Sequence, residues 1–217
     1  MNDINRGNNS QEYWNQKHVI QYSSEEYNFS QLENDPLSYH YVASKIIEDN
    51  KESIERKSML EIGCAVGYFS SYVKQRVVPD FEVVGWDFSP SGIKLAKERN
   101  KDIQGLIFEE RDVILNPVDK DYGIICSFET IEHFEEGLNY TLLNNWLDHC
   151  EYLILSTVDT KDSCNGEHLS HYTIDTFDQK GYNVLWKAKL APIFMPDGTY
   201  HYIAFLIKGK LNEIKEY

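Results

Sequence analysis

Two short segments of the chain carry side chains that can transfer protons or bind metal ions. The first holds Glu129, Glu132 and His133, directly after the apolar run YGIICSF. Because the two glutamates are three residues apart and the histidine adjoins the second, a helical turn would gather both carboxylates on one side with the imidazole near them. Such a group can bind a hard divalent cation, orient a hydroxyl group or accept its proton. A later segment adds His168 and His171 at i and i+3.

A glycine loop is the third feature with chemical potential. The segment LEIGCAVG places Gly63 where an apolar run ends and Gly67 where a helix is expected to begin. Glycines at such a turn let the backbone approach a ligand closely, and the helix N-terminus offers free N–H groups. The dinucleotide pattern G-x-G-x-x-G would need glycines at Ala65 and Tyr68, and the phosphate-loop pattern is also absent from the sequence. The loop therefore suits a nucleotide-like ligand not held by phosphates, or it is a purely structural turn.

The elements that must position these residues alternate between strand and helix. Buried strands are predicted for the apolar runs 59–63, 81–87, 105–113, 122–128 and 151–157. Helices are predicted between them at 68–78, 90–100 and 136–149. This alternation indicates crossover units and a mainly parallel α/β sheet covered on both faces. Ligands bind beyond the carboxyl ends of such strands, so the glycine loop and both histidine segments should face one crevice.

The two ends of the chain depart from this alternation. A short helix at 173–179 precedes the apolar runs 182–190 and 200–209, predicted to form an antiparallel pair at the sheet edge. Near the N-terminus, apolar residues at helical spacing predict a helix that begins at Pro36. The Tyr13–Trp14 pair either belongs to a lid over the crevice or simply packs. We expect one domain, 1–217, with an N-terminal helical cap in 1–55 and the core in 56–217.

Composition limits the partners and the compartment. The chain has 217 residues, of which 41% are hydrophobic, enough for a single folded core. Its 21 basic and 35 acidic residues give 21 − 35 = −14, which repels nucleic-acid backbones and anionic membrane surfaces. The four cysteines, Cys64, Cys126, Cys150 and Cys164, form no dense framework, and no long apolar segment is present. A cytoplasmic protein is therefore expected.

The pattern E-x-G-x-x-x-G, formed here by Glu61, Gly63 and Gly67, resembles the first motif of class I S-adenosylmethionine-dependent methyltransferases. The resemblance implies a Rossmann-like, doubly wound sheet of seven strands, mainly parallel, with an antiparallel C-terminal edge pair. It also implies that Asp87 binds the ribose hydroxyls and that Asp112 faces the adenine amine, although Asp87 could instead cap the helix near residue 90. The implied cofactor residues are Glu61, Gly63, Cys64, Ala65, Gly67, Asp87, Phe88, Asp112, Val113 and Ser127.

The segment E-x-x-E-H resembles two groups within this family, the small-RNA 2′-O-methyltransferases and the ubiquinone-biosynthesis O-methyltransferases. This resemblance implies a Mg²⁺ or Mn²⁺ ion held by Glu129, Glu132, His133 and a loop histidine, where spacing favours His168 over His171. The same residues are also expected to be catalytic. A metal-free histidine or glutamate base and a structural role remain open alternatives.

These features together predict O-methylation of a small polar metabolite, such as a sugar or a nucleotide-linked sugar, because an alcohol needs help to lose its proton. RNA is disfavoured by the net charge and by the lack of basic clusters interleaved with aromatics. The alternatives are a metal-free N- or O-methyltransferase of another small molecule and a non-catalytic binding protein. Oligomeric state is left open.

Overall fold

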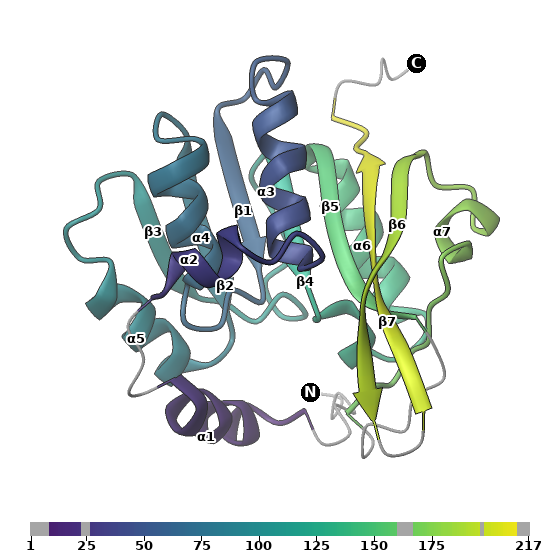
Figure 1. Ribbon diagram of the computed structural model, residues 1–217, viewed down its shortest axis with the longest axis horizontal. Coiled ribbons are helices and arrows are strands. Elements are labelled where there is room, and N and C mark those ends of the chain that lie inside the picture. The colour runs from purple at the N-terminus through teal and green to yellow at the C-terminus, as the bar shows by residue number, and fades with distance from the viewer. Residues whose placement is uncertain (1–8, 23–26, 160–166, 196–197, 212–217) are drawn as a thin grey trace.

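The computed structural model describes residues 9–22, 27–159, 167–195 and 198–211. Its centre is a seven-stranded sheet in the order β3-β2-β1-β4-β5-β7-β6 (Figure 1). The strands are β1 (Ser58–Ile62), β2 (Glu82–Asp87), β3 (Leu106–Glu110), β4 (Tyr122–Phe128), β5 (Cys150–Asp159), β6 (Val184–Met195) and β7 (Gly198–Lys208). Strands β1 to β5 pair in parallel, whereas β7 runs antiparallel to both β5 and β6. The predicted mainly parallel sheet with its antiparallel edge pair is confirmed.

Helices cover both faces of this sheet. One face packs against α3 (Tyr39–Asn50), α4 (Tyr68–Tyr72) with its π-helical continuation η1 (Val73–Val77), and α5 (Pro90–Arg99). The other face packs against α6 (Leu138–Asp148) and α7 (Thr176–Gln179). Apolar residues on alternate positions of β1 divide between the two faces, as expected of a strand buried on both sides. This double cover holds the carboxyl ends of β1 to β5 at one edge of the molecule.

The N-terminal segment contains three helices with different places in the fold. Helix α3 packs in the core through Ala43 and Ile47, whereas α1 (Gln11–Tyr22) lies beneath the carboxyl ends of the parallel strands (Figure 1). The short α2 (Phe29–Glu33) links them. Among the described residues, no helix combines the length and apolar character needed to cross a membrane. Cys64, Cys126 and Cys150 are buried free thiols, and Cys164 lies outside the described residues.

The predicted start of α3 at Pro36 is wrong. The helix begins at Tyr39 because the chain first makes a turn in which the Ser38 N–H donates to the Asp35 carbonyl (3.0 Å) and the Leu37 N–H to the Asp35 carboxylate (3.3 Å). This turn is the local arrangement that aspartate offers in competition with a helix. Similarly, α6 begins at Leu138, two residues later than predicted, after Gly137 at φ 97°.

Candidate active site

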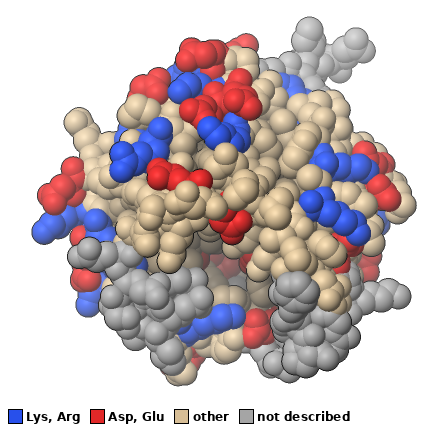
Figure 2. Space-filling view, viewed as in Figure 1, with Lys and Arg blue, Asp and Glu red and all other residues tan. Residues whose placement is uncertain are grey.

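A cavity of about 490 Å³ opens at the carboxyl ends of β1, β2 and β4. Figure 2 shows the molecule hollowed toward this end. The cavity is lined by the glycine loop, the ends of β2 and β4, the turn after β3, the segment at 167–168 and one side of α1. Of the predicted site residues, those that line it are Glu61, Gly63, Cys64, Ala65, Asp87, Phe88, Asp112, Val113, Glu129, Glu132, His133 and His168.

The glycine loop takes a left-handed path at three positions, Gly63 (φ 78°), Ala65 (φ 49°) and Gly67 (φ 79°). A Cβ on Gly63 would lie 2.2 Å from the Thr130 hydroxyl oxygen, so both the backbone angle and the space require glycine there. Gly67 has a different reason to be glycine, because a Cβ would lie 2.5 Å from the Phe108 ring. Gly67 is not among the residues that line the cavity, and its close approach to Phe108 gives it a packing role, while its cofactor contact stays a prediction.

Asp87 lies at the end of β2 and faces the cavity while almost fully buried. One carboxylate oxygen accepts the Ala65 N–H (2.9 Å) and the other accepts the Ser89 N–H (2.8 Å). A carboxylate accepts up to about four hydrogen bonds, so Asp87 has acceptor capacity beyond these two bonds. Burial raises the pKa of Asp87, opposed by His18 and the main-chain N–H groups. The helix-cap alternative is not what forms, because the Ser89 hydroxyl, not Asp87, accepts the Gly92 N–H of α5.

Two other predicted cofactor residues, Glu61 and Asp112, have structural partners of their own. Glu61 accepts the main-chain N–H of Ser70 (2.9 Å) and its hydroxyl, and burial raises the pKa of Glu61 to about 7. Asp112 lies in the turn after β3 and accepts the Ile114 N–H (3.1 Å). Ser127 is fully buried in β4 and is not among the residues that line the cavity, and its cofactor contact stays a prediction.

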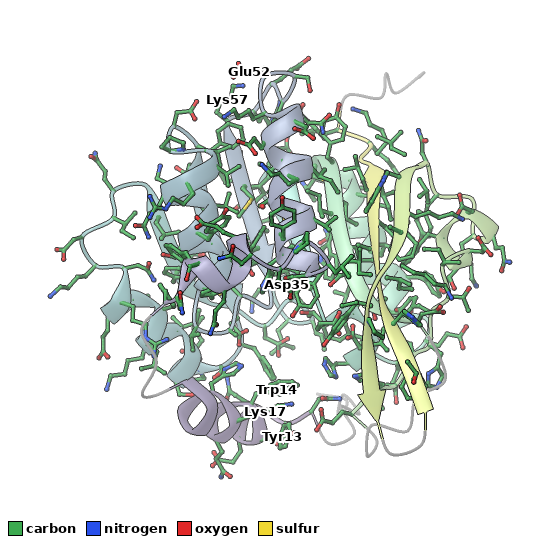
Figure 3. All side chains as sticks on the ribbon, viewed as in Figure 1. Tyr13, Trp14, Lys17, Asp35, Glu52 and Lys57 are labelled. Carbon is green, nitrogen blue, oxygen red and sulfur yellow. The ribbon has the colours of Figure 1, made fainter. Side chains whose placement is uncertain are left out.

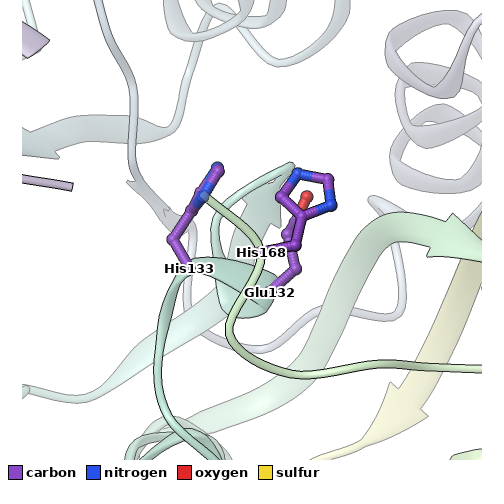
Figure 4. A group of neighbouring side chains, drawn as sticks. All are labelled: Glu132, His133 and His168. Carbon is purple, nitrogen blue, oxygen red and sulfur yellow. The ribbon is translucent and has the colours of Figure 1, made fainter. Parts of the chain in front are cut away.

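A group of three side chains lies beneath the mouth of the cavity. Glu132 and His133 belong to the single 3₁₀ turn η2 (Ile131–His133), and His168 approaches from the segment after β5 (Figure 4). One potential ligand atom from each residue lies within 4.8 Å of the others. Two main-chain bonds from residues 169 and 170 to the Glu132 carbonyl (2.8 and 3.1 Å) hold the segments together. His171 is exposed, so the structure brings His168 to the group.

Glu129 does not join this group, contrary to the prediction of two carboxylates on one side. It has a left-handed backbone (φ 48°), and one of its carboxylate oxygens accepts the Ser156 hydroxyl (3.1 Å). The rule that residues three apart share a side applies within a helix, and Glu129 precedes the turn. It lines the cavity but lies outside the cluster of Glu132, His133 and His168.

His133 has a defined tautomer. Its Nδ1 lies 3.0 Å from the Glu167 carbonyl oxygen, which can only accept, so Nδ1 carries the proton and Nε2 keeps a lone pair. Burial lowers the pKa of His133 to about 4, and the bond to Glu167 opposes this only in part. The imidazole is therefore neutral at pH 7, and its Nε2 can bind a cation or accept a proton.

Helix α1 closes the cavity, and Tyr13, Trp14 and Lys17 lie toward it in Figure 3. The Trp14 ring meets the His133 ring edge-on at 5.2 Å, and Lys17 lies 4.3 Å over the Trp14 ring. Trp14 thus both lines the cavity and packs against His133, and the lid stays a prediction. Neither Lys17 nor His18, which is buried near Asp87, could be recognised from a sequence pattern, because their partners are distant along the chain.

Glu167 was also not anticipated, although it directly precedes His168. It accepts hydrogen bonds from Tyr13 and from Lys17 (3.4 Å). Burial raises the pKa of Glu167, but the Tyr13 bond and the Lys17 charge outweigh it and lower the pKa overall. The carboxylate is therefore charged at neutral pH and joins α1 to the segment that carries His168.

Comparison with known proteins agrees with this architecture. A family model described as a methyltransferase domain matches residues 54–195. A putative methyltransferase, 235L, of Invertebrate iridescent virus 6 is 32% identical over 90 residues, 42% of this chain and 32% of the viral protein. Malonyl-[acyl-carrier protein] O-methyltransferase 1 of Ilyobacter polytropus is 29% identical over 110 residues, 50% of this chain and 41% of the relative. The chain thus spans less than half the length of these curated relatives.

Solved structures share the fold at low sequence identity. Magnesium protoporphyrin IX methyltransferase of Synechocystis PCC 6803, with bound S-adenosylmethionine, has a TM-score of 0.64 at 13% identity, covering 96% of this chain and 100% of that one. The N-methyltransferase NodS of Bradyrhizobium japonicum WM9, with S-adenosylhomocysteine, has a TM-score of 0.63 at 15% identity, covering 89% and 98%. Because the family model matches more than half of the chain, the protein belongs to the methyltransferase-domain family that this model describes.

Proposed function

We propose that the protein transfers a methyl group to a hydroxyl of a small polar molecule, such as a sugar or a nucleotide-linked sugar. The observation that carries this proposal is the cluster of Glu132, His133 and His168 inside the cavity, with the Nε2 lone pair of His133 available. An alcohol holds its proton tightly at neutral pH, so a positioned acceptor for that proton is the group that O-methylation most needs.

The residues have distinct roles in this reaction. S-adenosylmethionine supplies an electrophilic methyl group on a positively charged sulfur. As the acceptor oxygen forms its bond to the methyl carbon, the carbon–sulfur bond breaks with its electron pair going to sulfur, and the hydroxyl proton goes to Nε2 of His133. The neighbouring Glu132 carboxylate stabilises the imidazolium that forms. Alignment of the acceptor under α1 supplies the proximity that in-line displacement requires.

The same cluster fits a divalent cation. Glu132, His133 and His168 offer one carboxylate oxygen and two imidazole nitrogens, a donor set that suits Mn²⁺ or another transition metal better than Mg²⁺. Because His133 donates through Nδ1 to a carbonyl, its Nε2 is oriented as metal-bound histidines usually are. A bound cation would lower the pKa of the acceptor hydroxyl. Glu129 would lie outside this ligand set, unlike the sequence-based expectation.

For the cofactor, we propose that Asp87 accepts the ribose hydroxyls and that Asp112 and Val113 contact the adenine. In support, these residues line one side of the cavity together with Phe88 and the glycine loop. We also propose that residues 1–55 act as a cap chiefly through α1, since α3 packs in the core of 56–217.

A small acceptor agrees with the charge of the surface. Lys and Arg side chains are interspersed with Asp and Glu on the face seen in Figure 2, and the net charge is −14. The rings of Trp14, Tyr39 and Tyr202 line the cavity and offer apolar faces on which a sugar or base can stack. This surface and this charge oppose a nucleic-acid substrate.

Calorimetric titration with S-adenosylhomocysteine tests the cofactor part, for which one-site micromolar binding is expected. A screen of sugars and nucleotide-linked sugars then tests the acceptor. His133→Ala should retain cofactor binding and lose at least about 100-fold in turnover, whereas His171→Ala, on an exposed histidine of the same segment, should match the wild type. Absence of binding by the folded protein would overturn the proposal in favour of a non-catalytic role. Equal turnover of the two variants would remove His133 from the reaction.

A further inference from the structure

We infer that Glu167 is a positioning residue: it latches α1 to the active site and, through its own carbonyl, holds His133 in the tautomer that leaves Nε2 available. This inference rests on the proposed function of His133. It assigns a role to a residue that contacts neither reacting group. It also means that His133 can act as a base only when α1 is docked over the cavity.

The main-chain carbonyl of Glu167 receives two hydrogen bonds. His133 Nδ1 lies 3.0 Å from this oxygen, and the Asn9 side-chain amide donates to it at 2.6 Å. A carbonyl oxygen has two lone pairs, so the bonds from His133 and Asn9 use its full capacity. The position of this one oxygen therefore sets both the rotation of the His133 ring and which of its nitrogens carries the proton.

Within the described part of the chain, both hydrogen bonds to the Glu167 carboxylate come from α1. Tyr13 donates to one carboxylate oxygen, and Lys17 lies 3.4 Å from the other. The Lys17 ammonium also lies 5.3 Å from the Tyr13 ring centroid, which keeps the two donors together. The two donors are one helical turn apart, so they share the face of α1 turned toward the cavity (Figure 3). If α1 moves away from the cavity, the Glu167 carboxylate loses both of its hydrogen-bond donors.

Helix α1 has a second, separate attachment on the opposite side of the cavity. The Ser89 hydroxyl donates to the Asn15 side-chain oxygen (2.8 Å), and the Ser91 hydroxyl donates to the Asn15 carbonyl (2.9 Å). The helix therefore bridges from the start of α5 to Glu167. Removing the Glu167 contacts should free one side of α1 and leave the other attached.

The tautomer of His133 provides a direct test without an identified acceptor. Long-range ¹H–¹⁵N spectra of protein labelled in its histidine rings distinguish Nδ1–H from Nε2–H at pH 7, and His133→Gln assigns the signals. With saturating S-adenosylhomocysteine, the wild type should show the Nδ1–H form. Glu167→Ala and the double variant Tyr13→Phe, Lys17→Met should both raise the Nε2–H form to half or more of the population.

A second readout reports α1 itself. Amide hydrogen exchange in α1 should become at least about 10-fold faster in both variants, since local opening sets the exchange rate. Glu12→Gln is the matched control, because Glu12 is an exposed carboxylate on the same helix whose partner is Gln16. It should leave both the tautomer and the exchange rate unchanged.

The double variant keeps Glu167 in place, so it decides the question if Glu167→Ala fails to fold. If the folded variants keep the wild-type His133 tautomer, or the wild-type amide exchange rate in α1, the positioning role of Glu167 is refuted. Failure of S-adenosylhomocysteine to bind the wild type overturns the proposed function instead. In that case the comparison of tautomers in the ligand-free proteins still decides the latch.

Discussion

Asp87→Asn is the substitution whose effect on cofactor binding follows most directly from the structure. The two carboxylate oxygens of Asp87 accept the N–H groups of Ala65 (2.9 Å) and Ser89 (2.8 Å), and the carboxylate has further acceptor capacity for a ribose hydroxyl. Asparagine has a single acceptor oxygen. Whichever way its amide turns, the NH₂ group faces a main-chain N–H, and one ribose hydroxyl loses its acceptor.

The expected loss can be estimated from that one bond. A hydrogen bond to a charged acceptor contributes about 1.5–3 kcal/mol. Since about 1.4 kcal/mol corresponds to a tenfold change in affinity, the dissociation constant for S-adenosylhomocysteine should rise about 10- to 150-fold. The folded state should also lose some stability, because either the Ala65 N–H or the Ser89 N–H loses its acceptor on Asp87.

Isothermal titration calorimetry of Asp87→Asn beside the wild type measures this change. Asp80→Asn serves as the control, because Asp80 is exposed and does not line the cavity. Circular dichroism establishes that each variant is folded at the temperature of the titration. A dissociation constant for folded Asp87→Asn within twofold of the wild type would refute the assignment of Asp87 to the ribose.

Three further predictions concern the glycine loop and the histidine cluster. Gly63→Ala should lower the free energy of unfolding in urea by about 2–5 kcal/mol, because of left-handed backbone strain and a clash with Thr130. Gly181→Ala, at φ 83° with open space around it, should lower it by only about 1–2 kcal/mol. Equal losses in the two variants would contradict the clash. Because burial lowers the pKa of His133 to about 4, and a base acts in its neutral form, kcat/KM should stay level down to about pH 5 and fall as the pH approaches 4; a fall centred near pH 6.5 would show a solvated imidazole. If a cation assists, treatment with a chelator should remove turnover and Mn²⁺ should restore it more fully than Mg²⁺; turnover indifferent to the chelator would leave His133 as a metal-free base.

The sheet could be predicted because its signals are local. A run such as YGIICSF is apolar at every position, which only a strand covered on both faces tolerates, and β4 occupies this run with every residue buried. The glycine loop could also be predicted, because the turn from β1 into α4 has no room for a side chain at Gly63. The same kind of signal placed Asp87 at the end of β2 and facing the cavity.

A single backbone angle accounts for the error at Glu129. The spacing of Glu129 and Glu132 implied a shared side only if both lay in one helix, but Glu129 takes φ 48° and its carboxylate binds Ser156. Spacing does not encode such an angle, because residues other than glycine adopt it rarely. The burial of Ser127 follows from its place in β4, a strand that is covered on both faces of the sheet.

The polar contacts that hold α1 in place could not be predicted from the sequence, and their chemistry explains why. The helix has polar residues on several sides, and Asn15 and Lys17 find partners in segments 74 and 150 residues away. A helix docked by an apolar stripe leaves a period in its sequence and stays in place, since its burial is favourable whenever water surrounds it. A helix docked by hydrogen bonds exchanges them for bonds to water, at a net gain of only about 0.5–1.5 kcal/mol each. Because α1 is held by polar contacts, its docking leaves no periodic apolar pattern in the sequence. The same contacts can be broken readily, so α1 can move away from the cavity when ligands exchange.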